Sequence, residues 1–167
     1  ASPGQVLAEG QRLALRLGKS NPPELLLSEA VSSPLLCGIW RPRIVLPASF
    51  EQTFASDELG SILLHELIHW RRRDVLAGWL QLLAQSLFWF HPFVWWANAR
   101  ARHERECACD EAALGFAQCG PKTYGETLLK ALLAAEGRGA PALGFVGVFE
   151  HDTRVQIRLQ RIMAYRP

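Results

Sequence analysis

The sequence predicts an α+β fold that is mostly helical and contains a small antiparallel sheet. Apolar residues recur at helical spacing from about residue 56 onward, whereas three short apolar runs separated by turn residues lie between residues 24 and 47. The length of 167 residues suits one domain, so we expect a single domain over residues 1–167. Apolar residues make up 49% of the chain and charged residues 20%, which excludes a disordered protein.

The N-terminal part combines one helix with the predicted sheet. The helix begins at Pro3 and ends at Gly18. The apolar runs at 24–31, 34–40 and 43–47 predict two or three antiparallel strands. Proline cannot donate a backbone hydrogen bond, so the prolines that bound these runs place at least one strand at an edge of the sheet.

Helices are predicted for most of the remaining chain. The first of them has Ser56 as its N-cap and ends at three arginines, which suit the negative end of a helix dipole. His91 followed by Pro92 separates the next two, because the residue before a proline disfavours helical geometry. Residues 137–150 indicate a loop, and Asp152 can cap the last helix. The expected helices are 56–73, 75–90, 92–114, 121–136 and 153–165.

The pentapeptide His65-Glu66-Leu67-Ile68-His69 is the strongest functional signal in the chain. Histidines four residues apart on a helix lie on one face, so both imidazoles can bind one zinc ion. Glu66 lies beside them, where it can take a proton from a water that the ion has acidified. The apolar neighbours of the motif indicate a partly buried helix, and a buried glutamate without a metal or base partner is costly.

A catalytic zinc site needs a third protein ligand, which should come from another element. Glu106 and Asp110 share one face of a predicted helix farther along the chain. Glu106 would bind the zinc ion, and Asp110 would accept the second ring N–H of a ligand histidine.

Two alternatives to a zinc-binding role of Glu106 remain open. Arg102 and Glu106 could form a surface pair one helical turn apart. His103, Cys107 or Cys109 could be the ligand instead, although cysteine suits closed structural zinc sites better. Cys107 lies about 100° from Glu106 around the helix, so only one of the two can face the metal.

Other polar residues near the motif have less definite roles. Asp74, five residues after His69, could cap the next helix, pair with an arginine or steady the zinc site, and we favour a structural role. Tyr124, His103 and His151 are candidates for stabilising an oxyanion by residue type alone, and each is more typical of a structural position. None of these roles follows from spacing.

The segment Val75–Ala97 carries no formal charge and is long enough to cross a bilayer as one helix. Such a helix would separate its ends by roughly 30 Å, which would place His69 and Glu106 on opposite sides of the membrane. A break at His91 and Pro92 instead folds the segment into a helical hairpin and brings Glu106 back toward His69. We therefore predict the hairpin, with its aromatic residues either in the core or against a bilayer surface.

The segments HELIHWRRRD and FWFHPFVWWANARARHERECACDEAAL together resemble the zinc-peptidase domain of the bacterial antirepressor family, which includes integral-membrane sensor-transducers of beta-lactam resistance. The resemblance covers about residues 30–165, with SSPLLCGIWRPRIVLP matching the strand region and RVQIRLQRIM the segment before the last membrane helix. It implies a gluzincin-like fold in which Zn²⁺ is the cofactor and Glu66 is the base. The implied zinc ligands are His65, His69 and Glu106. Asp110 falls where gluzincins have the aspartate that supports a ligand histidine, whereas Cys107 is not part of the family pattern.

The function that this resemblance implies is that of a zinc endopeptidase in a bacterial signalling protein. Its substrate would be a cytoplasmic repressor or the parent protein itself, held beside an edge strand among residues 34–46. The parent would lie in the inner membrane, and this chain would be a soluble domain excised from its cytoplasmic face. The alternative is a zinc-binding module that relays conformational change without hydrolysis. Eighteen basic against sixteen acidic residues argue against a nucleic-acid partner.

Overall fold

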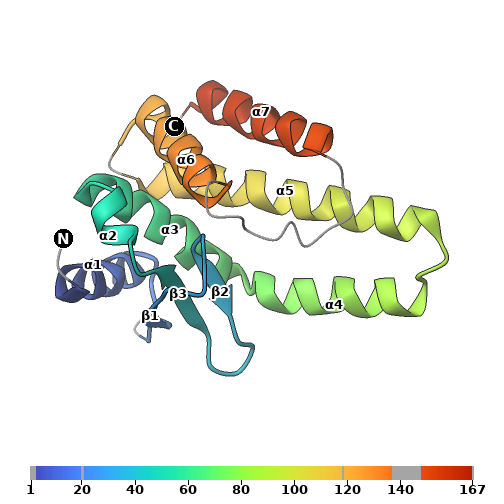
Figure 1. Cartoon of the computed structure of the whole chain (residues 1–167), viewed down its shortest axis with the longest axis horizontal. Helices are drawn as coiled ribbons and strands as arrows, with labels where there is room; N and C mark the ends of the chain where they lie inside the picture. The colour runs from blue at the N-terminus through green and yellow to red at the C-terminus, as the bar shows by residue number, and fades with distance from the viewer. Residues whose placement is uncertain (1–2, 20, 118, 137–147, 167) are drawn as a thin grey trace.

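The computed structural model describes residues 3–19, 21–117, 119–136 and 148–166. Across these residues it confirms the predicted fold class, a mostly helical α+β chain with a small sheet (Figure 1). The helices are α1 (Pro3–Arg16), α2 (Phe50–Thr53), α3 (Ser56–Arg72), α4 (Asp74–Leu87), α5 (Pro92–Phe116), α6 (Pro121–Glu136) and α7 (Val148–Ala164). The strands are β1 (Glu24–Ser28), β2 (Leu35–Cys37) and β3 (Arg43–Pro47).

The sheet is mixed, which corrects the prediction of an antiparallel one. Its strand order is β1-β3-β2, with β1 parallel and β2 antiparallel to β3. Strands joined by short connections commonly pair as antiparallel hairpins, but here the chain passes from β1 to the far edge of the sheet before it returns through β3. The central strand is the one with a buried apolar face, since Ile44 and Leu46 are both fully buried. The predicted edge strand is present as β2.

Helix α3 lies at the centre of the fold, because its apolar residues point in several directions. It packs against α1, α5 and α6, and its end lies near β2 (Figure 1). The buried residues of α3 include both apolar side chains and the first histidine of the motif. They are Leu59, Ser61, Ile62, Leu63, Leu64, His65, Leu67 and Ile68.

Several helix boundaries differ from the predictions. The N-cap of α3 is Ala55 rather than Ser56, since the carboxylate of Glu58 accepts the Ala55 N–H at 2.8 Å and satisfies the helix start. Helix α7 already begins at Val148, ahead of the predicted cap Asp152. The short helix α2 was not predicted. Of the predicted loop at 137–150, residues 137–147 lie outside the described residues, and 148–150 belong to α7.

The segment that could have crossed a bilayer forms two helices, as predicted. Arg73, with φ of 60°, turns the chain from α3 into α4 in the left-handed region. Helix α4 ends at Leu87, His91 is extended, and Pro92 is the first residue of α5. Helices α4 and α5 then lie side by side and project beyond the rest of the molecule (Figure 1). Among the described residues, no helix has both the length and the apolar character needed to span a membrane.

Candidate metal centre

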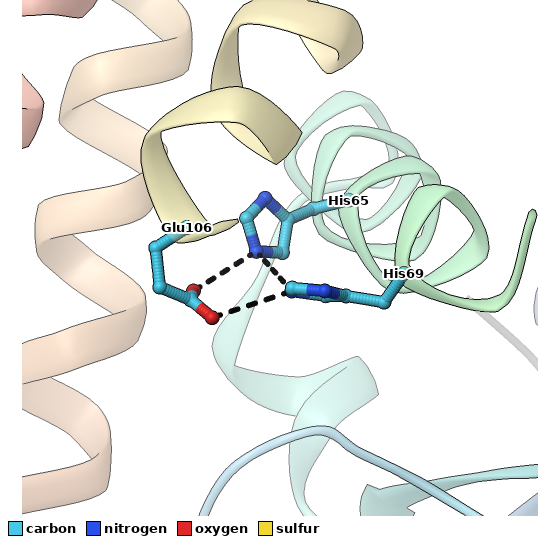
Figure 2. A group of neighbouring side chains, drawn as sticks. All are labelled: His65, His69 and Glu106. Carbon is cyan, nitrogen blue, oxygen red and sulfur yellow. Dashed lines mark hydrogen bonds and ion pairs between the residues drawn. The ribbon is translucent and has the colours of Figure 1, made fainter. Parts of the chain in front are cut away.

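Three side chains from α3 and α5 point at one another in the middle of the molecule (Figure 2). Nε2 of His65 lies 3.1 Å from Nε2 of His69. The carboxylate of Glu106 lies 3.5 Å from the first of these nitrogens and 3.6 Å from the second. The structure therefore brings together the three predicted ligands, whose donor atoms could hold a metal ion.

The arrangement follows from helix geometry and from the hairpin. His65 and His69 are one turn apart on α3, and their rings meet edge to face with centroids 4.8 Å apart. The α4–α5 hairpin returns the chain along α3, so Glu106 on α5 faces both rings. Burial of the apolar side of α3 leaves the two histidines 11% and 13% exposed, whereas the Glu106 side chain is 35% exposed.

The distances among the three donor groups fit a tetrahedral zinc ion. With metal–ligand bonds of about 2.0–2.1 Å, tetrahedral ligand atoms should lie about 3.3 Å apart. The two Nε2 atoms lie 3.1 Å apart, His65 Nε2 lies 3.5 Å from Oε2 of Glu106, and His69 Nε2 lies 3.6 Å from Oε1. These separations bracket that value, with the carboxylate facing the two rings through different oxygens. Two imidazoles and one carboxylate also form a common donor set of catalytic zinc sites, in which the fourth position is left for water or substrate.

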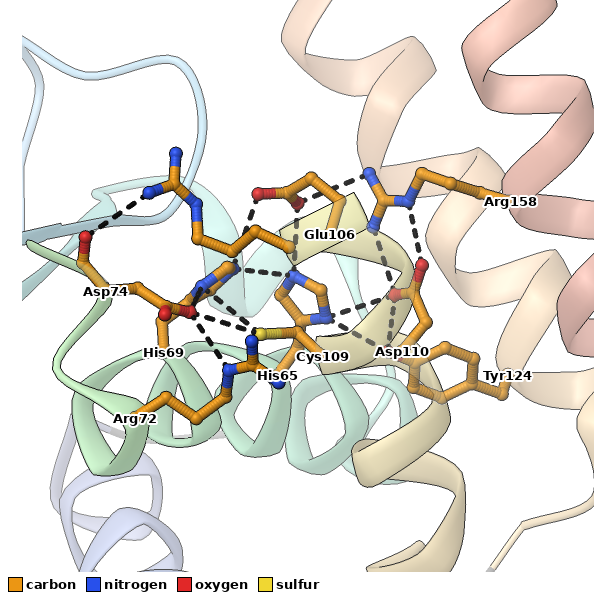
Figure 3. A network of polar contacts seen from close by, with 10 residues as sticks. His65, His69, Arg72, Asp74, Glu106, Cys109, Asp110, Tyr124 and Arg158 are labelled. Atoms are coloured by element: carbon orange, nitrogen blue, oxygen red, sulfur yellow. Dashed lines mark hydrogen bonds and ion pairs between the residues drawn. The ribbon is translucent and has the colours of Figure 1, made fainter. Parts of the chain in front are cut away.

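The second nitrogen of His65 is held by a buried polar cluster (Figure 3). Its Nδ1 lies 3.1 Å from Oδ1 of Asp110 and 3.1 Å from the Tyr124 hydroxyl. The Tyr124 hydroxyl donates to the same aspartate oxygen at 3.0 Å. Asp110 is 1% exposed, so its carboxylate fixes the orientation of the His65 ring from the side opposite the other two donors.

Arg158 on α7 is a member of this cluster that the sequence reasoning missed. Its guanidinium donates to both oxygens of Asp110, at 2.7 and 3.0 Å, and lies 3.5 Å from the Glu106 carboxylate. A planar guanidinium suits such bidentate pairing, and here it supports two carboxylates at once. No local pattern identifies it, because it lies far along the chain among other arginines of an amphipathic helix.

The second nitrogen of His69 is held in a similar way by Asp74 (Figure 3). Oδ2 of Asp74 lies 2.8 Å from Nδ1 of His69, and Arg72 lies 3.4 Å from the same oxygen. This contact supports the third role left open for Asp74, that of steadying the site, beside the structural role that the sequence favours. The spacing of five residues could have indicated it, since the left-handed turn at Arg73 folds the start of α4 back against the histidine.

The alternative third ligands lie elsewhere. His103 and Cys107 are both buried, and their Nε2 and Sγ atoms lie 3.7 Å apart in a contact of their own. Cys109 is close to the other side of His69, with Sγ 3.3 Å from Nδ1 and 3.4 Å from Asp74. His69, Asp74 and Cys109 form a second possible metal-binding group. Burial raises the pKa of the Cys109 thiol in the absence of a metal.

The charged groups of the cluster shift one another's pKa values. Burial alone would lower the pKa of His65, but its contacts with Asp110 and Glu106 raise that pKa to about 10. Burial would raise the pKa of Glu106, yet the neighbouring histidines and Arg158 lower it to about 2. Desolvation raises the pKa of Glu66. Without a metal, these shifts favour an anionic Glu106 carboxylate facing a protonated His65 ring.

A cavity of about 230 Å³ opens beside these donors. His65, Glu66 and Glu106 line one side of it, and Arg158 also contributes. Apolar residues of α6 and the chain just before β2 also line it. The wall residues on α6 are Leu128, Ala131, Leu132 and Ala135, and those before β2 are Ser33 and Pro34.

The candidates for oxyanion stabilisation do not gather at this cavity. Tyr124 lines it, but its hydroxyl already donates to Asp110. His103 contacts Cys107 instead, and the side chain of His151 lies outside the described residues. Of the cationic groups, the described part of the cavity wall includes Arg158, which reaches Glu106 and Asp110.

Comparison with known proteins adds an independent observation. Residues 5–163 match the BlaR1 peptidase M56 family. The chain is 38% identical over 104 residues to the regulatory protein BlaR1 of Bacillus licheniformis, which covers 62% of this chain and 17% of the relative. It is 29% identical over 104 residues to the methicillin resistance mecR1 protein of Staphylococcus aureus, covering 62% of this chain and 18% of that protein. The chain thus spans less than a fifth of the length of these relatives. With nearly its whole length matched, the chain belongs to the BlaR1 peptidase M56 family.

Proposed function

We propose that this chain is a zinc-dependent endopeptidase whose metal is held by His65, His69 and Glu106. The approach of these donors to within 3.1–3.6 Å of one another carries the proposal, because it is close to the spacing of ligand atoms around zinc, and because His65 and Glu106 also line the cavity. Membership of a peptidase family supports the same conclusion from outside the geometry.

Each side chain of the site would have its own role in hydrolysis. Bound zinc would supply Lewis acidity, which polarises a scissile carbonyl and acidifies water. Glu66, on the cavity wall beside His65, takes the proton of the attacking water and delivers it to the leaving amine nitrogen. Asp110 and Asp74 keep the two imidazoles oriented through their Nδ1 atoms, and Arg158 holds Asp110 and Glu106 in place.

The surroundings of the cavity favour an extended peptide with an apolar side chain next to the scissile bond. The α6 wall offers Leu128 and Leu132 to that side chain. Strand β2 pairs with β3 along one edge, and no described strand covers its other edge. Because Ser33 and Pro34 join β2 to the cavity, a substrate added to this edge would lead directly to Glu66.

We further propose that the substrate is a regulatory protein, either a cytoplasmic repressor or the parent protein itself. The printed names of the relatives, a regulatory protein and a methicillin resistance protein, support a signalling role. The site would then act at the cytoplasmic face of the bacterial inner membrane. The rival, a zinc module that relays conformational change without hydrolysis, shares the metal but not the need for Glu66.

The substitution Glu66→Gln separates the two functions. With zinc bound, we expect casein cleavage to fall at least 100-fold, since a positioned general base contributes about 10²–10⁴ in rate. Zinc content should stay at the wild-type level. The matched control is Glu111→Gln, at an exposed glutamate of α5, which should cleave normally. Unchanged cleavage by Glu66→Gln would reject the proposed mechanism, and zinc-loaded wild type without any cleavage would favour the relay.

Strand addition has its own test at Leu35, the first residue of β2. Leu35→Pro removes the side-chain contact and the backbone N–H, whereas Leu35→Ala removes only the side-chain contact. We expect the proline variant to raise the KM for long peptides more than the alanine variant does, at equal melting temperature. Equal KM values in the two variants would count against β2 as the substrate strand.

A further inference from the structure

The hairpin formed by α4 and the first part of α5 exposes an unusual number of large apolar side chains. Residues 75–99 carry no Asp, Glu, Lys or Arg. Near its turn, Trp89 is 68% exposed, Phe90 65% and Trp96 62%. The exposed apolar residues along the whole hairpin are Leu76, Trp79, Leu80, Leu82, Leu83, Leu87, Phe88, Trp89, Phe90, Phe93, Trp95 and Trp96. So many exposed large apolar side chains on one hairpin indicate an interaction site.

The described core of the protein does not cover this hairpin. Helix α4, which is described throughout, contributes no buried residue, whereas α3 immediately before it contributes eight. In Figure 1 the two helices of the hairpin extend away from the sheet and from α6 and α7. The hairpin therefore needs another apolar environment.

Several polar groups of the hairpin are paired within it, as a low-dielectric environment favours. At the turn, Nε1 of Trp95 donates to the Trp89 carbonyl at 2.7 Å. Between the helices, Nδ2 of Asn98 donates to the Gln81 carbonyl at 3.0 Å and lies 3.2 Å from Oε1 of Gln85. These contacts join the two helices and leave mainly apolar atoms on the outside.

Charged residues lie where the hairpin joins the rest of the protein. Arg71, Arg72 and Arg73 precede α4, and Arg100 and Arg102 follow the uncharged stretch on α5. Asp74 and Glu104 pair with some of them, so the base of the hairpin keeps an excess of positive charge. The uncharged part of α5, residues 92–99, is about 12 Å long at 1.5 Å per residue. One leaflet of a bilayer has about 15 Å of hydrocarbon, half of a core of about 30 Å.

We propose that the α4–α5 hairpin inserts into one leaflet of a bilayer that contains anionic lipids. Its apolar tip would enter the acyl region, and the arginines at its base would meet the headgroups. Both ends of the hairpin return to the same side, so insertion leaves the metal centre outside the hydrocarbon. A second copy of the chain is a poorer fit, because polarity changes along the axis of the hairpin rather than between two faces. The proposal does not depend on hydrolysis.

Vesicle binding by the 167-residue chain tests this proposal directly. Vesicles of phosphatidylcholine with a quarter phosphatidylglycerol should co-sediment the protein, and pure phosphatidylcholine or high salt should weaken binding. The triple variant Trp89→Ser, Phe90→Ser and Trp96→Ser should bind at least tenfold more weakly. As a matched control, Leu15→Ser with Leu133→Ser changes apolar side chains that are 63% and 58% exposed elsewhere, and it should bind as the wild type does.

Brominated acyl chains provide a second measurement of the same insertion. They should quench tryptophan fluorescence of the wild type and lose most of this effect in the variant Trp79→Phe, Trp89→Phe, Trp95→Phe and Trp96→Phe, which retains an apolar hairpin. The proposal is overturned if wild-type protein fails to bind anionic vesicles or if the serine variant binds equally well. It is also overturned if the chain forms a dimer that the serine variant abolishes and that does not bind vesicles. Melting temperatures of all variants show whether the fold is intact.

Discussion

Helices α3 and α4 are neighbours along the chain, both rich in apolar residues, and yet their surroundings are opposite. Helix α3 lies between α1, α5 and α6, and eight of its residues are buried. Helix α4 contacts α3 and α5 and contributes no buried residue within the described chain. Only Arg73, in the left-handed region, separates them.

The comparison shows that apolar composition does not by itself determine which helix forms the core. In α3 the apolar residues are interrupted by polar ones that find specific partners, such as His65 with Asp110. In α4 they surround a helix that accepts hydrogen bonds from Asn98 of α5. The first helix is held by the protein, and the second is available to a different environment. The following predictions test this difference, from the largest effect to the smallest.

The buried cluster behind α3 should respond most strongly to mutation. Asp110→Ala removes the partner of Arg158 and of His65, and it leaves a buried guanidinium without its bidentate acceptor. We expect a loss of about 3–5 kcal/mol in the free energy of unfolding, measured by urea denaturation of the metal-free chain. Glu104→Ala breaks exposed pairs of Glu104 with Arg100 and Arg161 and should change stability little. Similar losses in both variants would contradict the account.

Leucine truncation compares the two helices directly. Leu63 on α3 is 0% exposed, so Leu63→Ala should cost about 2–5 kcal/mol in the free energy of unfolding. Leu83 on α4 is 56% exposed, so Leu83→Ala should stay within about 0.5 kcal/mol. Denaturation without lipid measures both. A large cost for Leu83→Ala would mean that the hairpin packs against the protein in solution.

The support of His69 by Asp74 can be measured by metal affinity. Asp74→Asn keeps the size of the side chain but removes the charge that faces Nδ1 at 2.8 Å. We expect the zinc dissociation constant to rise about 10–100-fold, the range typical of residues that orient a ligand histidine. Competition with a chromophoric chelator gives this constant. If Asp74→Asn binds zinc as wild type does, the residue has only the structural role first expected from the sequence.

The start of α3 should show a small effect that depends on pH. The Lys130 ammonium lowers the pKa of Glu58, and the Ala55 N–H acts in the same direction. A pKa lowered by folding stabilises the protein above the unfolded value of 4.5, and this stabilisation disappears as the pH falls below it. The free energy of unfolding of the wild type should therefore exceed that of Glu58→Gln by about 0.5 kcal/mol at neutral pH. Urea denaturation at several pH values should show this difference vanishing in acid. A difference that grows in acid would contradict this assignment.

Much of the fold could be predicted from the sequence because its signals are local. Proline after His91 predicts the hairpin, and the structure confirms the break there. The prediction of an antiparallel sheet was wrong because the order of strands depends on how the chain connects them across the sheet. The short runs 24–31 and 34–40 carry no information on that order. The cap Ser56 was wrong by one residue because Glu58 satisfies the helix start.

The candidate site also has a part that the sequence could predict and a part that it could not. The spacing of His65 and His69, and of Glu106 and Asp110, places each pair on one helical face, and the structure brings the two faces together. Arg158 could not be found, since its role depends on how α7 packs against α5. The roles of these residues in binding zinc remain predictions, which the last measurement addresses.

Zinc content is the most direct measurement of the central claim that two imidazoles and the Glu106 carboxylate hold one ion. The purified chain and its Glu106→Ala variant are equilibrated with the same zinc buffer, with Glu104→Ala as a control on the same helix, and the metal is measured by mass spectrometry. We expect about one zinc ion per chain in wild type and control, and at least 100-fold weaker binding in Glu106→Ala. Equal zinc content in all three proteins would contradict the claim and assign the third ligand to another residue.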